Sequence, residues 1–163
     1  MINRLDFDFK KISYLVQLRE EIDILLSQKC YCSAVNNAMI LLDSMTKSNN
    51  FPYAKNTESD RFVHFCDDCL KSEDQIGLTG AELYSIRNFM FHEGCFNINT
   101  KKTKLKEVNF RITDGIIHTS RITSISNDET IASIDVLIFV PLITEYFDKY
   151  KSNFNLDEIN FLF

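Results

Sequence analysis

The stretch LYSIRNFMFHEG, residues 83–94, decides the fold that the sequence predicts. Its apolar residues Leu83, Ile86 and Met90 recur at steps of three and four, which is the spacing of one face of an amphipathic helix. The ends of this helix are also marked: Thr79 and Glu82 have the spacing of a capping box. A glycine closes the stretch, where it is placed to end the helix. We therefore expect a helix that packs its apolar face into a core.

The same stretch carries three polar residues, Arg87, Asn88 and His92. Asn88 and His92 are four apart and lie on one helical face, while Arg87 is rotated by about 100° from Asn88. A guanidinium can hold a phosphate and a histidine can move protons near neutral pH, which is the minimal equipment for cleaving RNA without a metal. The alternative is a surface arginine and a histidine at a helix end, where the terminal carbonyls favour positive charge. The spacing alone favours this alternative.

Two further helices are predicted upstream by the same periodicity. Apolar residues at steps of three and four indicate a helix over about residues 8–28, and a second stripe runs from Ala34 to Met45. The polar segment around Asn49, Asn50 and Pro52 ends the second helix. Because the link between these two helices is short, we expect them to pack antiparallel.

A short third helix is expected in NTESDRFVHFCDDCLK, residues 56–71, with Ser59 or Asp60 as its N-cap. One face of it gathers apolar residues, namely Phe62, Phe65, Cys66, Cys69 and Leu70.

The period changes from 3.6 to 2 after the fourth helix, which predicts a β-hairpin over about residues 106–125 with its turn at Asp114-Gly115. A last helix is expected over about residues 135–151, with Asp135 as a possible N-cap and Pro141 as a kink. Residues 130–134 fit either a third strand or the start of that helix. We expect one domain spanning residues 1–163, with its helical core at about 8–94.

Composition limits the function. The chain of 163 residues has a net charge of −5, so attraction to RNA would come from a local patch and not from overall charge. The N-terminus lacks a signal-peptide core and no run of 18 apolar residues occurs, so we expect a cytoplasmic protein without membrane contact.

The five cysteines form an odd set that fits reduced thiols. The pairs Cys30 with Cys32 and Cys66 with Cys69 have spacings that a zinc site uses, and Cys95 stands apart. Because both pairs lie on or beside apolar stripes, buried and inert thiols are the favoured interpretation, with zinc binding as the weaker one. We expect neither a metal nor another cofactor.

The run Arg-Asn-x-x-x-His at residues 87–92 resembles the HEPN superfamily, the "higher eukaryotes and prokaryotes nucleotide-binding" domains. AVNNAMILLDSM, residues 34–45, and SDRFVHF, residues 59–65, are similar to the bacterial branch in which an "RF" helix precedes an "LYxxRN" helix. The resemblance covers about residues 8–94. It implies a mainly α fold, an antiparallel bundle of four core helices, to which the β-hairpin and the last helix are additions.

The resemblance also implies a function. Active members are metal-independent endoribonucleases and homodimers, often toxins or effectors in toxin–antitoxin and antiphage systems, so a cognate antitoxin or a neighbouring defence protein is an expected partner. Carried over, Arg87 would stabilise phosphate charge, His92 would be the general acid or base, and Asn88 would be the polar residue after the arginine. Some toxins carry a modifiable tyrosine where this chain has Gly94. Other members are inactive, so the alternative is a non-catalytic module that binds a protein or a nucleotide.

Overall fold

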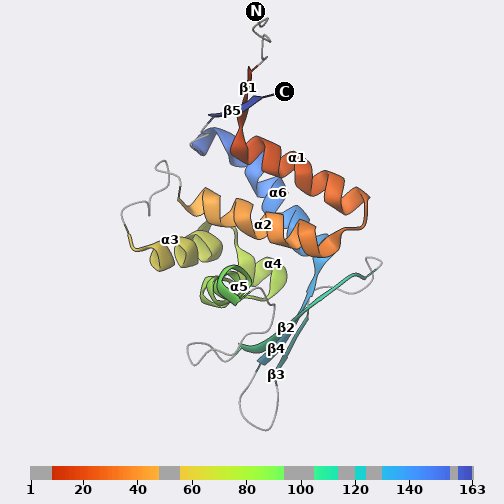
Figure 1. The fold of residues 1–163 in the computed structure, drawn as a ribbon. Helices are drawn as coiled ribbons and strands as arrows, with labels where there is room; N and C mark the ends of the chain where they lie inside the picture. The colour runs from red at the N-terminus through yellow and green to blue at the C-terminus, as the bar shows by residue number, and fades with distance from the viewer. Residues whose placement is uncertain are drawn as a thin grey trace, which may run out of the picture.

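The computed structural model describes the backbone of residues 9–47, 56–93, 105–113, 120–123, 130–154 and 158–162. Side-chain environments are described for residues 13–47, 56–91, 105–113 and 131–154. Within these segments the protein is mainly helical and carries two small sheets (Figure 1).

The helices of the described segments are α1 (Tyr14–Ser27), α2 (Tyr31–Thr46), α3 (Glu58–His64), α4 (Ser72–Ile76), α5 (Gly80–Glu93) and α6 (Val136–Tyr150). A π-helical turn (Phe65–Cys69) extends α3, and a 3-10 turn (Lys151–Asn153) extends α6. The strands are β1 (Phe9–Ser13), β2 (Leu105–Arg111), β3 (Ser120–Thr123), β4 (Thr130–Asp135) and β5 (Glu158–Leu162). None of the helices in these segments is long and apolar enough to span a bilayer.

Helix α2 is the centre of the bundle. Nine of its sixteen residues are buried, and it packs against both α1 and α6 (Figure 1). The three-residue turn from Gln28 to Cys30 reverses the chain between α1 and α2, which confirms the predicted antiparallel pair. The core contains four fully buried phenylalanines from α3, its π-helical extension and α6, namely Phe62, Phe65, Phe139 and Phe147. All three thirds of the chain therefore contribute to one core.

The first helix begins later than predicted. Residues 9–13 form β1, which pairs antiparallel with β5 at the far end of the chain, with Phe9 opposite Leu162 and Ser13 opposite Glu158. The prediction of a helix from residue 8 was therefore wrong for residues 9–13. Pairing with a distant strand satisfies the backbone groups of this segment, and a local pattern cannot reveal such a partner.

The N-cap of α3 is Thr57, the residue directly before the start of the helix at Glu58. The prediction of Ser59 or Asp60 as the N-cap was therefore wrong. The backbone N–H of Asp60 donates to Thr57 Oγ1 at 3.3 Å, which places the cap two residues before Ser59. The predicted apolar face is confirmed, because Phe62, Phe65, Cys66 and Leu70 are buried and Cys69 is partly buried.

The start of α5 is held by two devices. The predicted capping box is confirmed: the N–H of Thr79 donates to Glu82 Oε2 at 3.0 Å, and the N–H of Glu82 donates to Thr79 Oγ1 at 3.3 Å. At Gly80, a Cβ would lie 2.3 Å from the carbonyl oxygen of Val63, so only glycine lets α5 approach α3 this closely. The N–H of Gly80 also donates to Asp67 Oδ1 at 2.5 Å. Gly94, the predicted end of the helix, lies outside the described residues.

The predicted β-hairpin is wrong in its pairing. The strand order is β2-β4-β3, with β2 parallel to β4 and β3 antiparallel to β4, so β2 and β3 are separated by a strand from later in the chain. Ala132 and Ile134 of β4 are buried, and the central position of a sheet suits a strand with such residues. Residues 130–135 are therefore a strand. The predicted turn at Asp114-Gly115 lies outside the described residues.

The last helix is confirmed at nearly the predicted bounds. The N–H of Leu137 donates to Asp135 Oδ1 at 2.8 Å, which makes Asp135 the N-cap of α6. Pro141 lies inside the helix, and the kink expected there stays a prediction.

Candidate functional site

All three residues of the predicted site belong to α5, on the turns after the buried Leu83 and Ile86. Arg87 is buried, with 8% of its surface exposed, and Asn88 is partly buried. The backbone of His92 continues the same helix one turn beyond Asn88, while its side chain lies outside the described residues. The structure thus brings Arg87 and Asn88 together on one helix that also holds the backbone of His92.

The guanidinium of Arg87 donates to three side chains from three helices. Its Nε donates to Asp43 Oδ1 of α2 at 3.0 Å, and its Nη2 donates to Glu58 Oε1 of α3 at 2.5 Å. Its Nη1 donates to Asn88 Oδ1, the neighbour on α5, at 2.8 Å. Arg87 therefore joins α5 to α2 and α3 and is not an exposed surface arginine.

A second cation completes this group, which we call the Arg87 cluster: Arg87, Asn88, Asp43, Glu58 and Lys47. Lys47 Nζ lies 2.7 Å from Asp43 Oδ2 and 3.9 Å from Glu58 Oε1. Two cations and two carboxylates balance each other at neutral pH. The side chains of Lys47 and Glu58 are 48% and 46% exposed, so the cluster reaches the surface between the end of α2 and the start of α3.

Aromatic rings border the guanidinium. The Cζ atom of Arg87 lies 5.7 Å from the ring centre of Tyr84 and 5.2 Å from that of Phe91. Both distances are within the range of cation–π attraction, and the rings also limit where the guanidinium can move.

The charge of Arg87 is stable in this setting. Burial alone would lower the pKa of its guanidinium, but the hydrogen bond to Asp43 and the negative charges of Asp43 and Glu58 outweigh burial and raise this pKa. Arg87 is thus a permanent cation whose orientation is fixed by three acceptors. A guanidinium has five N–H groups, so three acceptors do not use all of its donors.

The partners of Arg87 were missed by the sequence analysis. Asp43 lies 44 residues before Arg87 and Glu58 lies 29 residues before it, so neither pairing follows from local spacing. One signal was available for Asp43: it is a carboxylate that directly follows the apolar run from Met39 to Leu42, and a charge buried in such a helix requires a partner.

The four cysteines that the structure describes do not gather into the zinc site that their spacing allows. Cys30 and Cys32 are exposed, Cys66 is buried and Cys69 is partly buried; Cys95 lies outside the described residues. Over the side chains that are described, no three histidine, cysteine or acidic residues meet in a group suited to a metal ion. Burial raises the pKa of the Cys66 thiol well above its usual value, with Asp67 and Cys69 adding to the effect. This thiol is therefore unreactive at neutral pH.

Comparison with protein-family models, with curated proteins and with solved structures gives no match for this chain.

Proposed function

We propose that the chain is a metal-independent endoribonuclease of HEPN type that works as a homodimer and serves as a toxin or defence effector. The observation that carries this proposal is the pairing of Arg87 with Asn88 on a continuous helix that includes His92. The family resemblance implies that an Arg-Asn-x-x-x-His run lies on one helix of the bundle, and α5 carries this run. A mainly helical fold with two small added sheets is compatible with it.

The proposed reaction is attack by a ribose 2′-hydroxyl on the neighbouring phosphate. The P–O2′ bond forms as the P–O5′ bond breaks, which leaves a cyclic phosphate and a 5′-hydroxyl. One group must take the proton of the 2′-hydroxyl and another must give a proton to the leaving 5′-oxygen. Two copies of His92, one from each subunit, can take these two roles.

The role of Arg87 is to stabilise the negative charge that develops on the phosphate. Asp43 and Glu58 would then act as positioning residues, since they fix the plane of the guanidinium before the substrate arrives. Glu58 is the partner whose side chain is partly exposed, and a phosphate that approaches Nη2 would compete with it. Binding of the phosphate would thus weaken the ion pair between Arg87 and Glu58.

The test is an RNA-cleavage assay in excess chelator with tRNA or total RNA. We expect the wild type to cleave and His92→Ala to be slower by about 100-fold or more. The matched control is His64→Ala, which removes a half-exposed histidine at the end of α3 and should leave cleavage unchanged. Equal rates for the wild type and His92→Ala would refute the proposal, and Arg87 variants are unsuited to this test because they also disturb the fold.

A second function is favoured by a different observation, the neutrality of the Arg87 cluster. Two carboxylates already bind the guanidinium of Arg87. Under this second proposal the Arg87 cluster has a structural role, which is to hold α2, α3 and α5 together. The protein would then be a non-catalytic module that binds a partner protein or a nucleotide, in line with its net charge of −5.

The two functions are separated by one pair of experiments. A non-catalytic module would leave RNA intact in chelator, and it would retain a partner in a pull-down or be stabilised by a nucleotide in a thermal-shift assay. Cleavage that depends on His92 would exclude it.

A further inference from the structure

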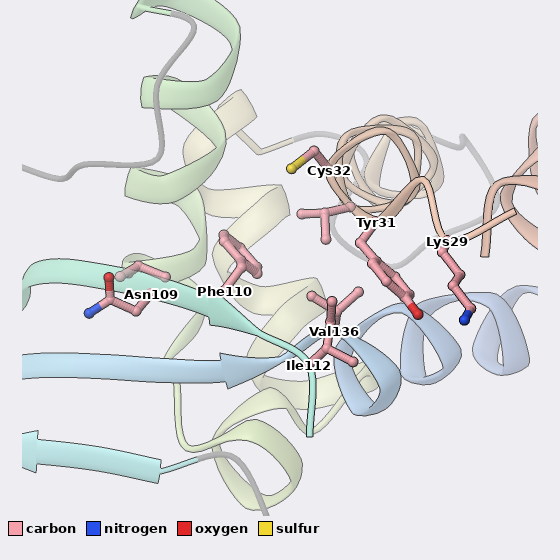
Figure 2. A pocket seen from close by; sticks show the side chains of 9 residues that line it. Lys29, Tyr31, Cys32, Asn109, Phe110, Ile112 and Val136 are labelled. Carbon is pink, nitrogen blue, oxygen red and sulfur yellow. The ribbon is translucent and has the colours of Figure 1, made fainter. Parts of the chain in front are cut away.

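A pocket of about 430 Å³ lies between the start of α2 and strand β2 (Figure 2). Tyr31, Cys32 and Val35 of α2 line one side. The other side is lined by Val108, Asn109 and Phe110 of β2 and by Ile112 just after it. Volumes of this size are typical of sites for small organic ligands. The pocket is independent of the proposed function, which concerns the other end of α2.

The walls of the pocket are mostly apolar. Val35, Val108 and Val136 are each at most 2% exposed, so they form a floor that belongs to the packed core. Phe110 is partly buried, and its ring centre lies 5.9 Å from that of Phe139, which holds it in place. Ile112 is 47% exposed and stands at the rim. An apolar ligand body would find a rigid floor here and would cover the side chain of Ile112.

The pocket has a polar end. Figure 2 shows the ammonium group of Lys29 and the hydroxyl group of Tyr31 directed the same way, toward α6 and away from the ring of Phe110. One formal positive charge therefore stands beside a mostly apolar volume, and Lys29 is the one charged residue among the described residues that line it.

The backbone at Lys29 is unusual. Its φ is +58°, in the left-handed region that favours glycine, and it ends α1 by donating its N–H to the carbonyl oxygen of Leu26 at 3.0 Å. Glycine would serve this turn with less strain. The turn therefore does not require the long cationic side chain that it presents to the pocket.

This pocket is well separated from the Arg87 cluster. Tyr31 and Asp43 lie twelve residues apart on α2, which corresponds to about 18 Å along the helix axis. A ligand in the pocket therefore does not contact Arg87, and binding can be measured without reference to RNA.

We propose that this pocket binds a small organic acid with an apolar body, its carboxylate at Lys29 and Tyr31 and its apolar part against Val35, Val108 and Phe110. The size of the pocket, its apolar floor and its single cationic end define this class. A neutral apolar molecule would leave the ammonium without an ionic partner among the residues that the structure describes. A highly charged anion would place charge against the valine floor.

Decanoate is the probe, and 1-decanol is its uncharged match. We expect saturable binding of decanoate to the full chain by isothermal titration calorimetry, with 1-decanol bound at least about tenfold more weakly. Decanoate should also slow alkylation of Cys32, which lines the pocket, more than that of Cys30, which does not.

The decisive variant is Lys29→Gly, which suits the left-handed backbone and removes the charge. It should weaken decanoate binding about tenfold while the protein stays folded. The control is Lys71→Gly, because Lys71 has the same φ of +58° but does not line this pocket, and it should bind decanoate like the wild type. Ile112→Trp should block the rim and abolish binding.

Three results would overturn the proposal. The first is the absence of saturable decanoate binding. The second is equal affinity for decanoate and 1-decanol, and the third is an unchanged affinity in Lys29→Gly.

Discussion

The two ends of α2 have opposite surroundings although they belong to one helix. At its last turns, Asp43 meets Arg87 and Lys47, and the space is filled by partnered charges. At its first turns, Tyr31 and Val35 border an apolar hollow of about 430 Å³ with a single cation at its edge. A cluster of partnered charges fixes the helices and orients a functional group. An apolar pocket instead lets a ligand gain free energy by burying its apolar surface.

The largest effect is expected at the filled end. Arg87→Met should lower the free energy of unfolding by about 3 kcal/mol, because it removes the cation from a buried group that includes Asp43. Urea denaturation measures this. Glu58→Gln is the control, since the side chain of Glu58 is 46% exposed, and it should cost no more than about 1 kcal/mol. If Arg87→Met costs as little as Glu58→Gln, the filled end is not a structural joint.

A smaller effect is expected where α5 begins. Gly80→Ala should cost about 2 kcal/mol, because the added Cβ would overlap the carbonyl oxygen of Val63 and push α5 away from α3. At Gly77 an added Cβ would meet no atom within 4 Å, and only the φ of +70° disfavours alanine. Gly77→Ala should therefore lower the free energy of unfolding by about 1 kcal/mol. Thermal or urea unfolding of both variants would show the order, and the reverse order would contradict the packing described for Gly80.

The buried thiol of Cys66 should make the stability of the protein depend on pH. The raised pKa of Cys66 means that the folded state keeps its proton while the unfolded thiol ionises above about pH 8.5. The contribution of the protonated Cys66 thiol to the free energy of unfolding is therefore complete at neutral pH. It declines as pH rises, by up to about 1.4 kcal/mol per pH unit. Between pH 8 and 9.5, the stability of the wild type should fall more steeply than that of Cys66→Ala. Parallel curves would show that Cys66 is not shielded from solvent.

The smallest expected effect on stability is a gain and not a loss. It concerns Lys29, beside the pocket at the start of α2. Lys29→Gly should raise the free energy of unfolding by roughly 0.5 to 1 kcal/mol, since glycine relieves the left-handed backbone. Lys71→Gly should give a similar gain at its own φ of +58°. Chemical denaturation of the two variants tests this, and a loss of stability in Lys29→Gly would mean that the lysine side chain supports the fold.

The parts of the fold that the sequence predicted are those with local signals. Helices α2, α5 and α6 follow from apolar spacing, and α5 and α6 also follow from side-chain caps within three residues, such as Thr79 with Glu82. The pairing of β1 with β5 and of β2 with β4 was missed, because a strand alone does not specify its partner. The same limit applies to the site. Arg87 and Asn88 stood out on α5, while Asp43 and Glu58 reach Arg87 only through the packing of helices.

The proposal that α5 carries RNA-cleaving chemistry, near the end of α2 that holds Asp43, can be tested directly. The most direct measurement is the initial rate at which wild type and His92→Ala cleave an end-labelled RNA in chelator, with the 2′-deoxy version of the same strand as a second substrate. We expect cleavage of the RNA only, cyclic phosphate ends, and a rate about 100-fold or more lower in His92→Ala. Equal rates for the two proteins, or cleavage of the 2′-deoxy strand, would contradict it.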